Sequence, residues 1–468
     1  MKKNIYILLA LLLLLNVACE NDLDIAPKDQ RTSGGFYKNA SDIESAVNAV
    51  YGGLQKNGLY GFNYHFLMET RSDNTFEEEP SNSGGFGDVD LFNRITTNGV
   101  FSKTWKDSYV TIQSANIVLN RIDAITDMDT DTKNSRKGEV KFIRALIYYN
   151  LVNLYGAVPL VTKETTNPTD FFGQGRTSKT DVYKQIIKDL TEAVSELPET
   201  NSTGRATKGA ANTLLGKVYL ANGNPQAAET ALRTVKRYTW INTYANLFGI
   251  ANENNAGSIF EVQFQSNING QSEGSKFAAK FTAQSNPGSK GNNLITQDLI
   301  NSFEPGDLRK NEIISDRGTS TLFISTKYLD ENRTVIEDGA NNVIVLRYAD
   351  VVLMLAEALN EEGYVANGEA FDLINKVRQR AGLPVLTATT IINQDEFKKA
   401  LLKERRHEFF MELHRWFDLK RLGNAVEVMN THFVNTGVNV TIDTNDLLLP
   451  IPQSQVDTDS AIIQNPGY

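Results

Sequence analysis

Two segments of the chain each carry a pair of predicted helices joined by a glycine-containing turn, and this repeated unit constrains the fold most strongly. Residues 206–237 form one pair around the turn NGNP, and residues 348–384 form the other around Gly363. Small residues lie where the paired helices would cross, namely Ala210, Ala211, Gly216, Ala221, Ala227, Ala228, Ala231, Ala356, Ala358 and Ala370. The pattern is typical of tetratricopeptide-like units, although their consensus Trp and Pro positions are missing. The sequence therefore predicts a mostly α-helical superhelix of degenerate helical pairs.

Further helices are predicted on both sides of these units. Apolar residues recur at helical spacing in residues 41–54, 103–122, 139–161, 180–198 and 395–423. Ser41 and Glu44 are placed to form a capping box at the start of the first of these helices. Gly156, with Pro159 beyond it, is a typical end for the third. Residues 71–99 lack helical spacing and are expected to form a long loop, which in a compact protein is usually functional or disordered.

One region has a different pattern and divides the helical part of the chain. Residues 259–265 and 321–328 alternate apolar and polar side chains, as half-buried strands do. A long stretch rich in Gly, Ser and Asn lies between them. We therefore expect a single domain over residues 41–468. It would consist of a helical part, a loop-rich insert with a few short strands, and a second helical part, at residues 41–255, 256–346 and 347–468.

The first residues of the chain have the three parts of a secretory signal. Lys2 and Lys3 precede an apolar run of about half the roughly 20 residues that a membrane-spanning helix needs. Residues 1–18 are therefore predicted to be a signal peptide. Cys19, the only cysteine, stands where bacterial lipoproteins carry their lipid, and residues 19–40 would then form a lipidated tether. The alternative is an ordinary signal peptide followed by an incidental cysteine.

The charge of the chain excludes one class of function. The formal net charge is −9, and removing residues 1–18, which contain two lysines and no acidic residue, makes it −9 − 2 = −11. An acidic chain without a basic block is a poor nucleic-acid binder. Attachment to an anionic membrane would likewise depend on the lipid at Cys19 rather than on charge.

Catalytic and metal-binding patterns are weak in this chain. Glu404, Glu408 and Glu412 follow an i, i+4, i+8 spacing that would place three carboxylates on one helical face. Basic residues crowd the same region, which favours ion pairs over catalysis. The four histidines form no HExxH pattern, and G-x-S-x-G and phosphate-loop motifs are absent from the sequence. We therefore expect a protein without catalytic activity, metal or cofactor.

Six segments together resemble the SusD/RagB family of Bacteroidetes outer-membrane lipoproteins. They are EVKFIRALIYYNLVNLYGAVPLV, RATKGAANTLLGKVYLANGN, VLRYADVVLMLAEALNEEG, INKVRQRAGLP, KERRHEFFMELHRWFDLKRLG and LLLPIPQSQVDTDSAIIQNPGY. The resemblance implies a tetratricopeptide-like frame and a lipid anchor on the outer face of the outer membrane. It also implies delivery of an oligosaccharide to a SusC-like TonB-dependent barrel transporter. Glu20 and Asp22 are similar to the surface-export signal of these bacteria. Arg144, Trp416, Asp418 and the QNPGY end belong to the family's recurring segments and are expected to be structural.

The ligand site is expected in the variable loops, where sugar rings would need aromatic faces and sugar hydroxyls would need amides or carboxylates. The candidates are Asp73, Asn74, Phe76, Phe86, Asp88, Phe92, Phe277, Phe281 and Asn293. The alternative for each phenylalanine is that it fastens its loop to the frame. None of the three tryptophans, Trp105, Trp240 and Trp416, lies in these loops. Peptide or glycopeptide binding therefore stays open beside glycan binding. A purely structural surface protein and a glycan-cleaving enzyme remain further alternatives.

Overall fold

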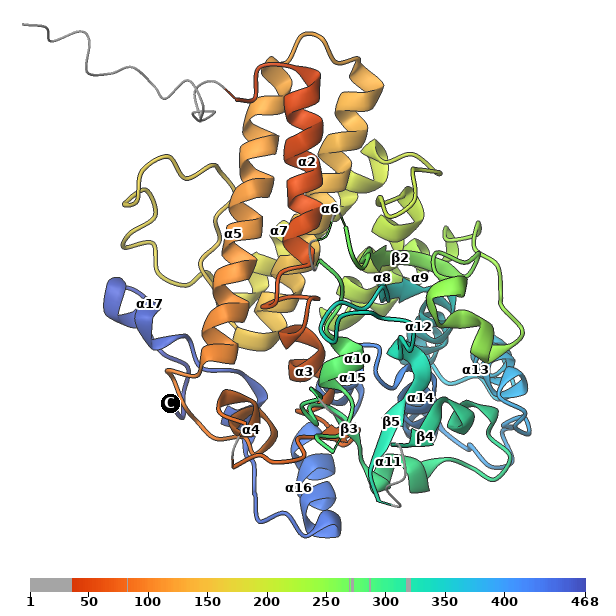
Figure 1. Ribbon diagram of the computed structural model, residues 1–468. Coiled ribbons are helices and arrows are strands. Elements are labelled where there is room, and N and C mark those ends of the chain that lie inside the picture. The colour runs from red at the N-terminus through yellow and green to blue at the C-terminus, as the bar shows by residue number, and fades with distance from the viewer. Residues whose placement is uncertain (1–35, 82, 269, 271–272, 286–287, 317–320) are drawn as a thin grey trace, which may run out of the picture.

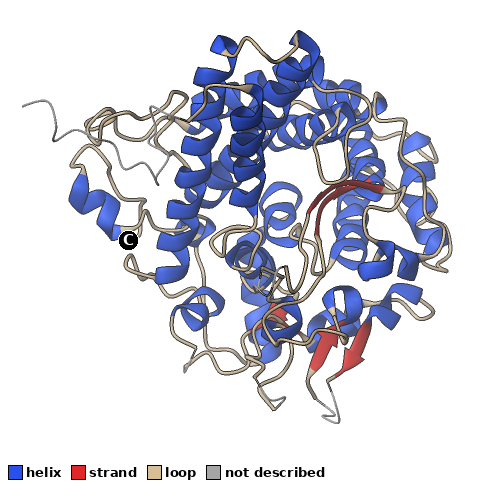
Figure 2. Ribbon diagram, turned by 45° about the horizontal axis from the view of Figure 1, so that its top comes forward, coloured by secondary structure: helices blue, strands red, loops and turns tan. Residues whose placement is uncertain are grey.

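The structure is a computed structural model that describes residues 36–468 apart from 82, 269, 271–272, 286–287 and 317–320. The predicted signal peptide, Cys19 and all of the tether before residue 36 lie outside the described residues. Among the described residues, no helix is both long enough and apolar enough to cross a membrane. The prediction of a mostly helical protein is confirmed, because strands occur only as short pieces (Figure 2).

Four long helices of the first part of the chain stand side by side (Figure 1). They are α2 (Ala40–Leu54), α5 (Gly99–Arg121), α6 (Thr130–Tyr155) and α7 (Lys179–Glu196). Local signals explain several of their ends: Ser178 caps the start of α7, and Gly156, with φ of 77°, follows the last residue of α6. The expected capping box at Ser41 is wrong. Helix α2 begins one residue earlier, and the side chain of Asn39 caps it by accepting from the backbone N–H of Asp42.

The two predicted helical pairs are present and extend this array. They are α8 (Lys208–Ala221) with α9 (Pro225–Arg233), and α12 (Tyr348–Glu362) with α13 (Glu369–Arg380). Helix α7 packs on α8, α8 on α9, and α9 on α12, so the second pair stacks on the first although some 115 residues separate them. Gly216 marks a close crossing, because a Cβ there would lie 2.5 Å from Cγ of Leu232. The prediction that small residues permit this packing is therefore confirmed at Gly216.

Short strands and helices fill the region between the two pairs. Strand β2 (Ser258–Val262) pairs with β6 (Val343–Arg347), β1 (Thr75–Phe76) with β3 (Leu294–Ile295), and β4 (Ile313–Ser315) with β5 (Phe323–Ser325), all antiparallel. Helices α10 (Phe277–Lys280) and α11 (Gln297–Ser302) accompany them. The expectation that β2 is half-buried is wrong. Its residue Glu261 is only 3% exposed and binds the side-chain amide of Asn342 at 2.9 Å.

The last part of the chain is helical, but it is broken where continuity was expected. It contains α14 (Gln394–Phe409), α15 (Arg415–Leu422), α16 (Ala425–Thr436) and α17 (Gln453–Thr458). Helix α14 ends at Phe409, and Met411 and Leu413 have positive φ angles of 64° and 68°. Glu412 therefore does not share a helical face with Glu404, which corrects the sequence expectation.

The segment expected to be one long loop, residues 71–99, also contains regular structure. Besides strand β1 it forms a short helix, α4 (Gly85–Asp90), and it follows another, α3 (Asn63–Glu69). Val89 and Phe92 of this segment belong to the main core of the molecule, Phe86 packs against that core, and Phe76 packs against a smaller cluster of buried residues. Residues 71–99 are therefore largely part of the folded frame.

Candidate functional site

Two segments that the sequence singled out as ligand loops meet in the structure, although about 200 residues separate them. Strand β1 pairs with β3, so that Thr75 faces Ile295 and Phe76 faces Leu294. Beyond the strands, the backbone N–H of Glu78 donates to the carbonyl of Gly291 at 3.0 Å. We call the described residues of 75–90 and 283–293 the paired-loop surface. Loops held on a rigid frame in this way commonly carry binding residues.

Six of the nine candidate residues lie in the interior beneath this surface. Each is at most 6% exposed: Asp73, Asn74, Phe92, Phe277, Phe281 and Asn293. Both carboxylate oxygens of Asp73 accept hydrogen bonds of 2.7 Å from Arg415, and Arg406 lies 3.1 Å away. Burial alone would raise the pKa of Asp73, but the two arginines outweigh it and hold this pKa well below its ordinary range. This carboxylate is therefore already fully engaged by protein cations.

The two buried amides among the candidates are also engaged. Asn74 donates to the carboxylate of Glu69 at 3.0 Å and accepts from Nε of Arg406 at 3.0 Å. The side-chain oxygen of Asn293 accepts from the hydroxyl groups of Thr70, at 2.7 Å, and of Thr75. These bonds tie β1 and β3 to α3 and α14, so both amides stabilise the loops in this structure.

The three buried phenylalanines pack against other rings of the frame. Phe277 and Phe281 stack on each other with centroids 5.2 Å apart, and both contact the imidazole of His65. Phe92 lies beneath the guanidinium of Arg71, at 4.1 Å, and edge-on to Trp416. This placement leaves no ring face open to a ligand and agrees with the alternative that these rings fasten the loops.

Phe76, Phe86 and Asp88 remain partly accessible on the paired-loop surface. Phe86 packs edge-on against Phe62 and Phe66, with centroids 5.3 and 5.0 Å away, and its remaining surface faces outward. Asp88 accepts from the side-chain amides of Asn93 and Asn98 at 3.0 and 3.2 Å. Ligand binding by these three residues stays a prediction.

Two carboxyl groups beside these residues have raised pKa values. Burial raises the pKa values of Glu77 and Asp90 to about 7 each. The backbone N–H of Glu77 donates to Asp90 at 3.1 Å, and Asn292 donates to the Glu77 carboxylate at 2.5 Å. Near neutral pH Asp90, which is partly exposed, can therefore either donate a hydrogen bond to a hydroxyl group or accept one from it, whereas Glu77 is only 2% exposed and bonds within the protein. Among the described residues, no cluster of His, Cys, Asp or Glu could hold a metal ion.

The three glutamates weighed as catalytic candidates are held by cations, which confirms the ion-pair prediction. Glu404 binds Arg309 at 2.6 Å and Arg378 at 3.1 Å. Glu408 binds Arg347 and Arg380, each at 2.5 Å. Glu412, in the turn after α14, binds Lys327 at 2.7 Å and Arg347 at 2.6 Å. The arginines come from β6, α13 and the segment after α11, so this ionic network holds the strand-rich region against α14.

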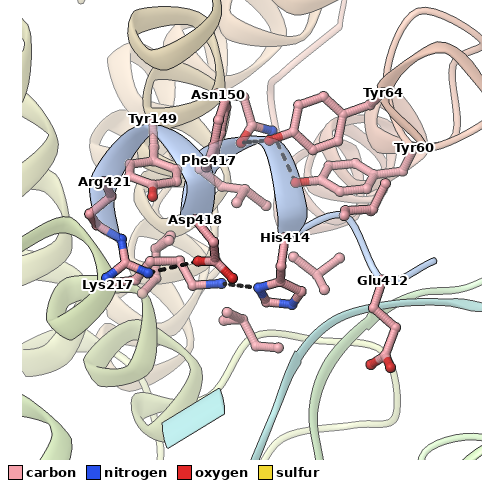
Figure 3. Close-up of a pocket in the computed structure, with 15 residues that line it drawn as sticks. Tyr60, Tyr64, Tyr149, Asn150, Lys217, Glu412, His414, Phe417, Asp418 and Arg421 are labelled. Carbon is pink, nitrogen blue, oxygen red and sulfur yellow. Dashed lines mark hydrogen bonds and ion pairs between the residues drawn. The ribbon is translucent and has the colours of Figure 1, made fainter. Parts of the chain in front are cut away.

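A second ionic cluster lies beside a small cavity between α6, α8, β6 and α15, which Lys217, Asp418 and Arg421 of this cluster line (Figure 3). Asp350 binds Lys217 at 2.7 Å and Arg405 at 2.9 Å, and Asp418 binds Arg405 at 2.8 Å and Arg421 at 2.7 Å. The cavity volume is only about 40 Å³, whereas pockets for small ligands are typically about 300–1,000 Å³. It is therefore part of the frame, which agrees with the structural role expected for Asp418.

The structure also contains a larger groove that the sequence did not predict. Helix α5, residues 159–175 and the segment around α17 enclose about 860 Å³. The only sequence signal was the pair Phe171–Phe172 in a loop otherwise rich in Thr, Asn and Gly. Phe172 is 53% exposed, which is unusual for a phenylalanine and could have drawn attention to this loop.

Models of two protein families match most of the chain. The model described as "SusD family" matches residues 306–468, and the model described as "Starch-binding associating with outer membrane" matches residues 23–220. The sequence is 28% identical to SusD-like protein P2 of Formosa agariphila, over 98% of each chain. It is 24% identical to the starch-binding protein SusD of Bacteroides thetaiotaomicron, over 52% of this chain and 47% of that protein.

Solved structures agree with these sequence matches. The fold is similar to that of a laminarin-binding SusD-like protein, with a TM-score of 0.79 and 28% identity, over 92% of this chain and 100% of that one. It is also similar to a SusD superfamily protein from Bacteroides vulgatus, with a TM-score of 0.82 and 25% identity over the same shares. The helical-pair frame, the six segments that resemble the family and these matches agree, and the chain belongs to the SusD/RagB family.

Proposed function

We propose that this protein is a cell-surface lipoprotein that binds an oligosaccharide or polysaccharide and delivers it to a TonB-dependent transporter of the outer membrane. The observation that carries the proposal is the similarity along nearly the whole chain to a laminarin-binding SusD-like protein. The family description of starch binding at the outer membrane points the same way. The protein would act by binding alone, since cations engage Glu404, Glu408 and Glu412.

The paired-loop surface supplies chemistry that suits a sugar. The partly exposed rings of Phe76 and Phe86 can pack against the C–H faces of pyranose rings. The carboxyl groups of Asp88 and Asp90, both partly exposed, can exchange hydrogen bonds with hydroxyl groups. The buried candidates beneath them hold the two loops together, so the surface is formed before a ligand arrives.

Attachment to the membrane is assigned to the lipid on Cys19. A hydrocarbon chain contributes apolar area at about 0.8 kcal/mol per buried CH₂, and stable anchoring needs more than one chain. The diacylglycerol of bacterial lipoproteins provides two. Residues 19–35 would then link the outer leaflet to the part of the chain that the structure describes, which begins at Phe36.

Peptide or glycopeptide cargo is the second candidate function. The observation that favours it is the position of the tryptophans: Trp105 lies in α5, Trp416 in α15 and Trp240 between α9 and β2. None of them lies on the paired-loop surface, although a tryptophan ring is a large platform for a sugar.

The test is a binding screen with the soluble form, residues 20–468. Affinity electrophoresis in gels containing laminarin or starch would be followed by calorimetry with laminarihexaose and maltohexaose, and a peptide mixture would be titrated in parallel. We expect retention by a polysaccharide, and about a tenfold loss of affinity, equivalent to about 1.4 kcal/mol, in the double variant Phe76→Ala and Phe86→Ala. Tyr364→Ala, which removes a half-buried ring between α12 and α13, is the matched control. Binding of peptides and of no glycan would contradict the proposal.

A further inference from the structure

The groove beside α5 has the size and position of a binding site. Its walls are residues 102–114 of α5, residues 159–175 and residues 452–462 around α17. In Figure 1 the loop 159–175, drawn in yellow, extends beside α5 and above α17. The enclosed volume of about 860 Å³ lies within the range of about 300–1,000 Å³ that is typical of small-molecule sites.

Hydrogen bonds within the protein hold the walls of the groove in place. The side-chain amide of Gln113 forms two hydrogen bonds with the backbone of Thr165, of 2.9 and 3.0 Å. The hydroxyl group of Tyr109 donates to the carbonyl of Pro159 at 2.7 Å. On the other side, the carboxylate of Asp459 accepts from the backbone N–H of Gly173 at 2.9 Å. A preformed site of this kind loses little conformational freedom when it binds.

Aromatic rings line the groove, and one of them is strongly exposed. Tyr109 of α5 is partly exposed, and its ring packs 5.1 Å from that of Trp105, which is only 3% exposed and belongs to the core. Phe172 is 53% exposed on the opposite wall, and Val110 of α5 is 43% exposed. Apolar side chains gathered in a concave surface rather than scattered singly indicate a binding site.

The remaining lining is polar but almost uncharged. Among the described residues that form the groove, Lys106 and Asp459 are the only charged ones, in a chain that is 22% charged. The carboxylate of Asp459 is already occupied by backbone N–H groups. Amides and hydroxyl groups supply the other polar atoms, among them those of Gln455, Ser454 and Asn167. A site of rings, amides and hydroxyl groups with little charge suits a neutral ligand that has both C–H faces and hydroxyl groups.

Extended peptides are less well suited to these walls. Peptide recognition by strand addition needs an unpaired strand edge. The groove is walled by helices and by a loop whose backbone groups at Val161 and Thr165 are bound by side chains of α5.

We propose that this groove is a second carbohydrate-binding site, separate from the paired-loop surface, that takes a neutral oligosaccharide segment. The proposal rests on the proposed function in one respect, that the cargo is a glycan. Rings of Phe172 and Tyr109 would cover the C–H faces of the sugar, and Gln455 would bind hydroxyl groups. Two sites on one protein would bind a long polysaccharide more tightly than a short oligosaccharide, because the second contact becomes intramolecular.

The test compares the two sites in the soluble form, residues 20–468. The groove variant carries Phe172→Ala and Gln455→Ala, and the loop variant carries Phe76→Ala and Phe86→Ala. Ile392→Ala, which removes an apolar side chain that is 67% exposed outside the groove, is the matched control. Retention would be measured in laminarin and starch gels. Hydrogen exchange of residues 102–114 and 165–175 would be measured separately, with and without laminarihexaose or maltohexaose. Melting temperatures would verify that every variant is folded.

We expect one of the two oligosaccharides to slow exchange in residues 165–175 of the wild-type protein and of the loop variant. The groove variant should lose this protection and about tenfold of its retention by the polysaccharide, and the control should lose neither. Unchanged retention of the groove variant, without protection at residues 165–175, would overturn the second site and leave the proposed function intact. Failure of the wild-type protein to bind either polysaccharide would overturn both. Protection of the groove by the peptide mixture or by self-association, and by neither oligosaccharide, would overturn the carbohydrate assignment alone.

Discussion

The substitution Glu408→Gln removes the negative charge at the centre of the ionic network on α14. The Glu408 side chain is fully buried and binds Arg347 and Arg380 at 2.5 Å each, with Arg309 at 3.5 Å. Glutamine has the same shape but no charge. Three buried guanidinium groups would then share fewer carboxylates, and we expect the folded state to lose stability.

The expected magnitude follows from two independent arguments. Burial alone would raise the pKa of Glu408, but the three arginines outweigh it and lower this pKa to about 2. Relative to an ordinary value near 4.5, this lowering of the pKa corresponds to roughly 3 kcal/mol at neutral pH. Removing one partner of a buried ion pair typically costs about 3–5 kcal/mol. The two estimates agree on a loss of about 3 kcal/mol.

Calorimetric melting of residues 20–468 at pH 7 would measure this loss. A chain of 468 residues has an unfolding entropy of roughly 1 kcal/mol/K at about 2.1 cal/mol/K per residue, so the melting temperature should fall by about 3–4 °C. The matched control is Glu396→Gln at the other end of α14, whose exposed carboxylate binds only the exposed Lys399. This change should cost less than about 1 kcal/mol.

The pH dependence gives a sharper signature. Since the pKa of Glu408 is lower in the folded than in the unfolded state, its charge contributes fully above about pH 4.5, and the contribution is lost as the pH falls toward about 2. The stability gap between the wild-type protein and Glu408→Gln should therefore close over this window. Equal stability at pH 7, or a gap that stays constant down to pH 2, would refute the reasoning.

Three further predictions concern the loops and a helix crossing. Asp73→Asn should destabilise the fold by about 3–5 kcal/mol because its arginine partners stay buried. Retention of the folded fraction in laminarin or starch gels should stay unchanged, and weaker retention would make Asp73 a ligand contact. Burial raises the pKa of Glu77 to about 7, so its contribution to the free energy of unfolding falls as the pH rises from about 4.5 to about 7. Glu77→Gln should therefore increase the free energy of unfolding above pH 7 by roughly 1–3 kcal/mol, as measured by urea titration. Gly216→Ala should cost about 1–3 kcal/mol by overpacking. Gly52→Ala, whose new Cβ would meet only the end of the Gln55 side chain at 3.8 Å, should stabilise α2 by up to about 1 kcal/mol. Equal melting temperatures of the two variants would contradict the close crossing.

The sequence alone determined most helices of this protein, because their limits are set by neighbouring residues. Ser178 starts α7 through its own side chain, and Pro225 stands in the first turn of α9. Gly156 ends α6 because its backbone adopts a positive φ. Apolar spacing and small crossing residues were sufficient to predict helical pairs.

For the candidate site, the sequence identified two loops but not the relation between them. The pairing of β1 with β3 joins residues about 220 positions apart, and no local pattern encodes such a partner. The same pairing decides that Asp73 and Asn293 are buried while Phe76 and Phe86 stay partly accessible. Only the tertiary structure could separate residues that hold the surface together from residues that remain available to a ligand.

Long-range charges also decided where the last helices break. Residues 395–423 have a continuous helical pattern, yet Lys327 and Arg347 bind Glu412 at 2.7 and 2.6 Å and hold the turn after Phe409. Their contacts offset the cost of positive φ angles at Met411 and Leu413. Local sequence thus determined which segments are helical, and burial of distant partners determined where α14 ends, which loop residues are hidden, and how α5 and α17 enclose the groove.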